Sequence, residues 1–219
     1  MESEVDKMKS IASQLSCPSG EAGLDMAEQM NQSNHGMTAN TIHHLELKAN
    51  EHVLEVGPGN AKHLSEIMLL APSIKYTGLE ISVDMKKEAE RLNVGFINQK
   101  QAQFHLYSGE KFPFEEAVFD KIMTVNTLYF WENPSATLNE IYRVLKPGGA
   151  CIITYSHKDF MKTLPFTQYG FQLYNDEDVL ALLERTIFKE PQVFLEIETV
   201  KSKHGEMITR PYSILRVTK

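Results

Sequence analysis

A glycine turn interrupts a short β-rich run in the first third of the chain. Val53–Val56 is followed by Gly57-Pro58-Gly59, and a helical stripe begins at Leu64. Glycines let the backbone approach a ligand closely, and the amino terminus of the next helix offers unpaired N–H groups. A strand, a glycine turn and a helix in this order predict a binding site, although a purely structural tight turn produces the same pattern.

Two carboxylates strengthen the case for a ligand. Glu80 closes the second predicted strand about twenty residues after the turn, where an acidic side chain meets the hydroxyl groups of a ribose. Glu55 lies within the end of the first strand, where a carboxylate suits a cationic amine better than a phosphate. Together with the turn, they predict a ligand that contains adenosine or a similar nucleoside.

Details of the turn help to choose between nucleoside ligands. Nicotinamide dinucleotides bind G-x-G-x-x-G turns, in which the last glycine lets helix and strand pack closely around a pyrophosphate. Lys62 occupies that position here, and Tyr155 is followed by Asp159 where a Tyr-x-x-x-Lys catalytic pair would have its lysine. The turn therefore favours S-adenosylmethionine, and an NAD(P)-dependent oxidoreductase remains the alternative enzyme.

Strands and helices alternate at short spacing through the middle of the chain, after an N-terminal part with helical periodicity. Two further β-like stretches close the chain as an antiparallel hairpin. This order predicts an α/β fold with a Rossmann-like, seven-stranded, mostly parallel sheet, a C-terminal antiparallel hairpin and N-terminal helices. The predicted strands are 53–56, 76–79, 103–107, 121–125, 150–155, 192–203 and 212–218, the last two joined around His204-Gly205.

Over roughly Val53 to Thr154 the sequence resembles the class I S-adenosylmethionine-dependent methyltransferases, and among them the group that includes the ubiquinone and menaquinone biosynthesis methyltransferases. The resemblance implies S-adenosylmethionine as the cofactor and methyl transfer to a small-molecule acceptor by in-line displacement. It is carried by four blocks in the expected order: Leu54–Asn60, Gly78–Ser82, Phe112-Pro113-Phe114 with Phe119-Asp120, and Arg143–Gly149.

The resemblance also implies how the chain is organised and which residues bind the cofactor. We expect one domain over 1–219, with 1–48 as an N-terminal helical cap, 49–155 as the cofactor-binding core and 156–219 as the substrate loop and closing hairpin. At Ser108 such families usually have an aspartate that accepts from the adenine amino group, and serine accepts more weakly. The expected cofactor-binding residues are Glu55, Gly57, Pro58, Gly59 and Asn60 after the first strand, Glu80 and Ile81 at the ribose, Ser108, Gly109 and Glu110 near the adenine, and Asn126 beside the transferable methyl group.

Candidates for the acceptor side are aromatic residues and two histidines. Tyr129, Phe130 and Trp131 follow the fourth strand and could form a pocket wall, with Phe166 opposite, although ordinary packing explains both groups equally well. His35 and His157 are candidate general bases, which the reaction needs only when the acceptor is protonated. The other histidines lack a metal-ligand spacing, so we expect no metal site.

Composition limits the class of protein further. The net charge of -7 disfavours nucleic acid, whose phosphates bind Lys and Arg. Cys17 and Cys151 are too few for a disulfide framework, and no run approaches the ~20 apolar residues of a membrane span, so we expect a cytoplasmic, soluble protein without a membrane partner. A protein that binds S-adenosylmethionine without turnover remains a third alternative. The patterns predict neither the acceptor nor the oligomeric state.

Overall fold

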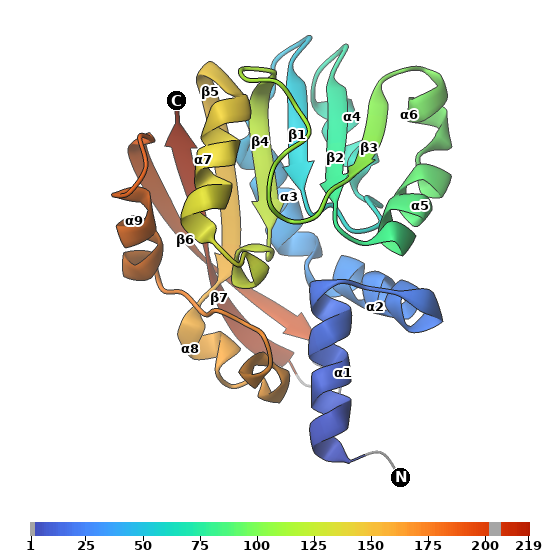
Figure 1. Cartoon of the computed structure of the whole chain (residues 1–219), viewed down its shortest axis with the longest axis vertical. Helices are drawn as coiled ribbons and strands as arrows, with labels where there is room; N and C mark the ends of the chain where they lie inside the picture. The colour runs from blue at the N-terminus through green and yellow to red at the C-terminus, as the bar shows by residue number, and fades with distance from the viewer. Residues whose placement is uncertain (1–2, 202–206) are drawn as a thin grey trace.

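A mixed sheet forms the centre of the computed structural model, which describes residues 3–201 and 207–219. Over these residues its seven strands are β1 (His52–Val56), β2 (Lys75–Glu80), β3 (Ala102–Leu106), β4 (Phe119–Val125), β5 (Leu145–Ser156), β6 (Lys189–Lys201) and β7 (Met207–Thr218). They lie in the order β3-β2-β1-β4-β5-β7-β6, with helices on both faces (Figure 1). The first five strands pair in parallel, and β7 pairs antiparallel with both β5 and β6. The predicted fold class is therefore confirmed.

Two of the helices that flank the sheet, α5 and α7, begin at a side-chain cap. Ser82 accepts a hydrogen bond from the backbone N of Met85 at the start of α5, and Asn133 accepts from Ala136 at the start of α7, where Pro134 takes the first turn. No helix within the described ranges is both long and apolar enough to traverse a lipid bilayer. The helices are α1 (Glu4–Ser16), α2 (Gly20–Ser33), α3 (His35–His44), α4 (Leu64–Leu70), α5 (Val83–Leu92), α6 (Val94–Asn98), α7 (Pro134–Val144), α8 (Lys158–Met161) and α9 (Asp176–Leu183), with short 3-10 turns η1 (Leu128–Phe130) and η2 (Pro165–Gln168).

Some element boundaries differ from the prediction. β5 begins at Leu145 instead of 150, because Leu145 already pairs with Phe119 of β4. The register then shifts, and the pairing continues with Ala150 opposite Lys121. The short helix α6 was not predicted, and β6 begins a few residues before the predicted start. The predicted joint of the hairpin at His204-Gly205 lies outside the described residues.

Apolar side chains cover the sheet on both faces because neighbouring residues of a strand point to opposite sides. On β1, Leu54 belongs to the cluster that includes α7 and α9, whereas Val53 belongs to the cluster that includes α3 and α4. Both residues are fully buried. Burial on the two faces explains why the parallel strands read as continuous apolar runs.

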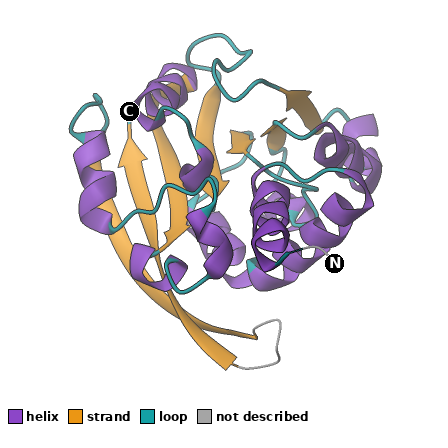
Figure 2. Cartoon of the chain, turned by 60° about the horizontal axis from the view of Figure 1, so that its bottom comes forward, coloured by secondary structure: helices purple, strands orange, loops and turns teal. Residues whose placement is uncertain are grey.

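The N-terminal helices α1 and α2 lie across the edge of the sheet where the parallel strands end (Figures 1 and 2). The backbone N of Gly20, at the start of α2, donates to Asp84 Oδ2 of α5 at 2.9 Å. In α3 the hydroxyl of Thr41 lies 2.6 Å from that of Thr154 on β5. The helices thus cover the edge at which open α/β sheets bind their ligands.

Candidate active site

The loop after β1 adopts backbone conformations that require glycine. Gly57 and Gly59 have φ of +72° and +57°, in the left-handed region. A Cβ on Gly57 would lie 2.5 Å from Thr127 Cγ2, whereas a Cβ on Gly59 would meet no atom within 4 Å. The loop is therefore tightly packed behind Gly57 and open at Gly59, as a ligand cradle requires.

The carboxylate of Glu80 is held at the end of β2 by backbone N–H groups. Its Oε2 accepts from Gly59 at 2.9 Å, and its Oε1 accepts from Ile81 at 2.8 Å and from Ser82 at 2.9 Å. Burial raises the pKa of Glu80, although these three bonds favour its ionised form. The side chain is thus fixed in orientation while it still borders the cavity beside the glycine loop.

Glu55, at the end of β1, is held by the buried Tyr76 and the half-buried His63. Its Oε2 accepts from Tyr76 Oη at 2.6 Å and lies 2.9 Å from His63 Nε2. Burial opposes protonation of His63, but the charge and hydrogen bond of Glu55 outweigh it and raise the histidine pKa. Because both contacts involve Oε2, the other carboxylate oxygen of Glu55 is available to a cationic group in the cavity.

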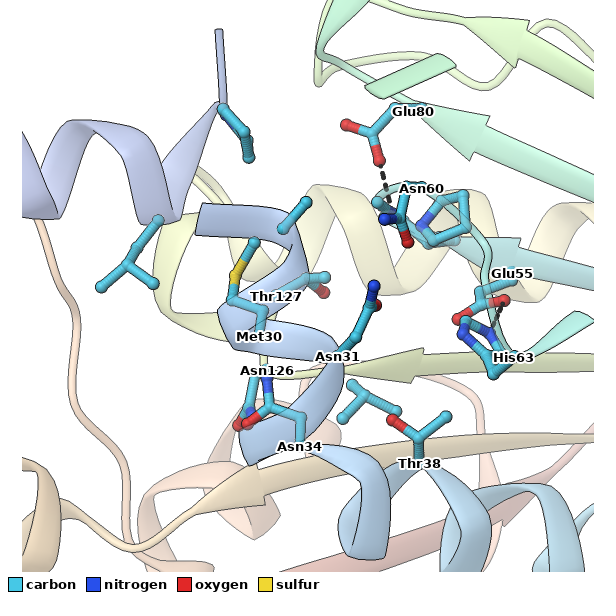
Figure 3. A pocket seen from close by; sticks show the side chains of 18 of the residues that line it. Met30, Asn31, Asn34, Thr38, Glu55, Asn60, His63, Glu80, Asn126 and Thr127 are labelled. Atoms are coloured by element: carbon cyan, nitrogen blue, oxygen red, sulfur yellow. Dashed lines mark hydrogen bonds and ion pairs between the residues drawn. The ribbon is translucent and has the colours of Figure 1, made fainter. Parts of the chain in front are cut away.

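A cavity of about 670 Å³ lies between this edge of the sheet and the N-terminal helices (Figure 3). That volume is typical of a site for a small molecule or cofactor. Within the described residues, no group of three or more His, Cys, Asp or Glu side chains is arranged to hold a metal ion. The residues of the predicted site that line the cavity are His35, Glu55, Gly57, Pro58, Gly59, Asn60, Glu80, Ile81, Gly109, Asn126, Phe130 and Trp131.

Five other expected site residues do not line the cavity. Ser108 and Glu110 are exposed, and their neighbours Tyr107 and Gly109 border the cavity in their place. The remaining three, all on the acceptor side, are held by contacts elsewhere in the chain. Tyr129 Oη accepts from the backbone N of Ser156 at 2.6 Å, His157 Nε2 lies 2.7 Å from Ser213 Oγ, and the Phe166 ring packs 5.8 Å from that of Phe171.

Tyr129 nevertheless contacts Asn126, which lines the cavity. Its hydroxyl donates to Asn126 Oδ1 at 3.0 Å. Asn126 has a φ of +57°, a strained conformation that asparagine tolerates better than most residues. Its backbone N donates to Thr154 O at 2.9 Å, which holds the strained residue between β4 and β5. Strain maintained in this way is common at functional sites.

The sequence analysis missed most of the cavity wall formed by the N-terminal helices. Helical periodicity identified α2 but did not indicate which of its faces meets the sheet. His63 could have been suspected because it follows the glycine turn, but only the fold places it against Glu55. The lining residues that the sequence did not indicate include Leu15, Met30, Asn31, Asn34, Thr38, His63 and Tyr107.

Comparisons with known proteins identify the family. A profile described as "Methyltransferase domain" matches residues 54–153. The uncharacterized methyltransferase YdaC of Bacillus subtilis is 29% identical over 119 residues, which cover 54% of this chain and 64% of that protein. A demethylmenaquinone methyltransferase of Symbiobacterium thermophilum is 30% identical over 125 residues, which cover 57% of this chain and 49% of that protein. The chain thus spans about half to two thirds of the length of these relatives.

The fold is shared with solved structures at lower sequence identity. A SAM-dependent methyltransferase from Aquifex aeolicus superposes with a TM-score of 0.61 at 18% identity, over 94% of this chain and 97% of that one. Taken with the matched profile and relatives, the chain belongs to the class I S-adenosylmethionine-dependent methyltransferases. S-adenosylmethionine is the cofactor of this family. The residues present fit it, because an open glycine cradle, a fixed carboxylate and a carboxylate with a free oxygen border one cavity.

Proposed function

We propose that the protein transfers the methyl group of S-adenosylmethionine to a small-molecule acceptor held between α2 and η1. The observation that supports this most is the 2.9 Å contact of Glu80 Oε2 with the backbone N of Gly59, because it joins the two nucleoside-binding features at one cavity. When bound, S-adenosylmethionine supplies a methyl group on a sulfonium, which is already a strong electrophile.

The cofactor half of the cavity follows from the chemistry of its side chains. Glu80 is suited to the hydroxyl groups of the ribose, and Glu55 to the ammonium group of the methionine part. Ile81, Tyr107 and Gly109 border the space next to Glu80 and are suited to the adenine ring. We propose that Asn126, which lines the same cavity, lies beside the transferable methyl group.

The protein's contribution to the reaction is position and the exclusion of water. Leu15 of α1 and Met30 of α2 line the cavity, together with Phe130 and Trp131 from the segment after β4. His35 is exposed at the rim and is our candidate general base for an acceptor that arrives protonated. His157 lies against β7 and has no part in this proposal.

We further propose that residues 1–219 act as one methyltransferase domain, with 1–48 as its cap. The cavity supports this proposal, because the N-terminal helices form one of its walls and residues of the core form the other. In this arrangement a change in the cap alters acceptor choice more than cofactor affinity.

Calorimetry followed by a transfer assay tests the proposed function. S-adenosylhomocysteine is expected to bind and to compete with S-adenosylmethionine, while NADH is expected not to bind. Label from methyl-tritiated S-adenosylmethionine should then appear in at least one member of a broad panel of hydroxyl, amine, thiol and carbon acceptors. Binding without transfer would favour a cofactor-binding protein without turnover, and NADH binding would favour an oxidoreductase.

A further inference from the structure

The strand β6 forms one edge of the sheet (Figure 1). It is 13 residues long, whereas β3 at the opposite edge has 5. Its inner side pairs with β7, and its outer side pairs with no residue that the structure describes. An edge of this length presents a row of backbone N–H and C=O groups with which another strand can pair.

The start and the centre of β6 differ in how they oppose such pairing. Near the start the ladder with β7 is interrupted between Lys189 and Gln192, and Pro191 within this interruption has no N–H group to donate. The ladder is regular from Gln192 onward, and Leu195 and Ile197 within it are 60% and 66% exposed. The centre of the edge strand therefore lacks the bulge and the proline that protect its start.

Leu195 and Ile197 lie on one face of β6 together with Val193, because alternate residues of a strand point to the same side. We call these three residues the edge row. Val193 is half-buried against the core cluster that includes α7 and α9. The edge row thus continues a buried face of the sheet out to an edge where it meets solvent, and a further strand at this edge would bury it.

A second copy of β6 fits the edge row. Two identical strands related by a twofold axis normal to the sheet pair antiparallel, and side chains that face each other then lie on the same face of the joined sheet. With the axis at Leu195, this residue faces its own copy and Val193 faces Ile197 of the second copy. Leu195 is also the midpoint of β6, which runs from 189 to 201, so this axis uses the whole strand. Every facing pair within the edge row is then apolar.

Three glutamates of β6 disfavour the neighbouring registers. An axis at position 193 or 194 places Glu190 opposite Glu196 or Glu198, and an axis at position 196, 197 or 198 places the last two opposite themselves or each other. Like charges directly opposite each other destabilise a sheet. With the axis at Leu195 the three glutamates instead face uncharged residues, which are Val200, Phe194 and Gln192 in that order. The charges of the strand therefore favour the same register that pairs the edge row with itself.

From this self-complementarity we infer that the chain forms a homodimer in which two copies of β6 pair antiparallel about Leu195, so that the two sheets become one. The pairing gives partners to the outer backbone groups of β6 and removes the edge row from water. No described residue of β6 lines the cavity, so each protomer keeps its own site. The inference is therefore independent of the proposed function and goes beyond it.

Analytical ultracentrifugation of the full chain over a concentration series tests the inference. The unmodified protein should have twice the mass of one chain at micromolar concentration and above. Leu195→Glu removes two leucines from the interface and sets two carboxylates opposite each other, so we expect the dissociation constant to rise at least about 100-fold. Leu195→Lys should have the same effect. An equimolar mixture of these two variants should restore the dimer, because a carboxylate then faces an ammonium group across the axis.

Thr199→Glu is the matched control, since it adds the same charge at an exposed position on the same face, opposite Pro191 at the interrupted start of the second copy, and should leave the dimer intact. Circular dichroism checks that each variant is folded, and Ile197→Glu, also expected to dissociate the dimer, replaces a Leu195 variant that is not. The inference is overturned if the unmodified protein is monomeric at about 100 µM, a hundredfold above a micromolar dissociation constant. A dimer that survives Leu195→Glu would place the interface elsewhere, and a mixture of folded Leu195 variants that stays monomeric would exclude this register; either result also overturns it. Binding of a monomer to phosphatidylcholine vesicles through Leu195 would assign the edge row to a lipid surface instead.

Discussion

Glu80 Oε2 accepts a hydrogen bond from the backbone N of Gly59 at 2.9 Å. The contact joins the end of β2 to the loop after β1, two elements that pair in parallel. Because the same carboxylate also receives the N–H groups of Ile81 and Ser82, it fixes the glycine loop as well as bordering the cavity. Glu80 therefore has a structural role in addition to the proposed ribose contact.

Glu80→Ala should cost both affinity and stability. Removal of the carboxylate leaves three backbone N–H groups without their partner, and we expect a loss of about 2 kcal/mol in the free energy of unfolding. Loss of two charge-assisted bonds to a ribose should weaken S-adenosylhomocysteine about 100-fold. Urea unfolding and calorimetry measure the two effects. Glu110→Ala is the control, since Glu110 is exposed and outside the cavity; an equal loss in the control would contradict the role of Glu80.

The two glycines of the loop should tolerate alanine unequally. Gly57→Ala meets both an unfavourable φ and the methyl group of Thr127, so we expect a loss of about 2–3 kcal/mol of stability. Gly59→Ala meets only the unfavourable φ, with open space around the new Cβ, and we expect about 1 kcal/mol. Urea unfolding without ligand compares them. Equal losses would show that Thr127 moves aside without cost.

The parallel core could be predicted because its signals are local. Each strand end, such as Glu55 or Glu80, is followed within a few residues by the turn or cap that positions it, and short continuous apolar runs mark the strands that are buried on both faces. The start of β5 at Leu145 could not be predicted, since it depends on pairing with Phe119 on another strand. Local patterns contain no information about such a long-range ladder.

The acceptor end of the site was much harder to predict, and the reason is sequence separation. Asn34 is oriented by Arg210, which lies 176 residues further along the chain. Asn40 contacts Tyr212 Oη, from which it is separated by 172 residues in the sequence. These contacts link the end of α2 and the middle of α3 to β7. The aromatic run after β4 was found because it follows a strand, but Tyr129 proved to face Ser156 instead of the cavity.

Removal of Arg210 should destabilise the protein through its partners. Arg210 is 7% exposed, and its loss leaves Glu198 without a cation and frees the carbonyl groups of Ser33 and Asn34. We expect Arg210→Met to cost about 3 kcal/mol, as for other broken buried pairs. Glu198→Met in addition should recover part of this loss, which a double-mutant cycle by urea unfolding measures. Strictly additive losses would mean that the two side chains do not interact.

The pair of His63 and Glu55 should make stability depend on pH. Because Glu55 raises the pKa of His63 above the ordinary value of 6.5, the folded protein holds the histidine proton more tightly than the unfolded chain does. The added stability is complete below that ordinary value and is lost as the pH rises through the higher pKa of the folded state. His63→Gln keeps a hydrogen-bond donor for Glu55 but removes the positive charge. The variant should therefore have a lower free energy of unfolding than the unmodified protein, and this difference should shrink as the pH rises.

A second histidine supplies the control for this prediction. Burial, followed by the charges of Lys146 and Lys75, lowers the pKa of His52 to about 4, so well above pH 6.5 it is neutral in both the folded and the unfolded state. His52→Gln should therefore shift the unfolding free energy by a constant amount over the window in which His63→Gln converges on the unmodified protein. Urea unfolding at a series of pH values well above 6.5 provides the measurement. A deficit of His63→Gln that stays constant or grows across this series would mean that His63 is neutral in the folded protein, and that Glu55 borders the cavity without a cationic partner.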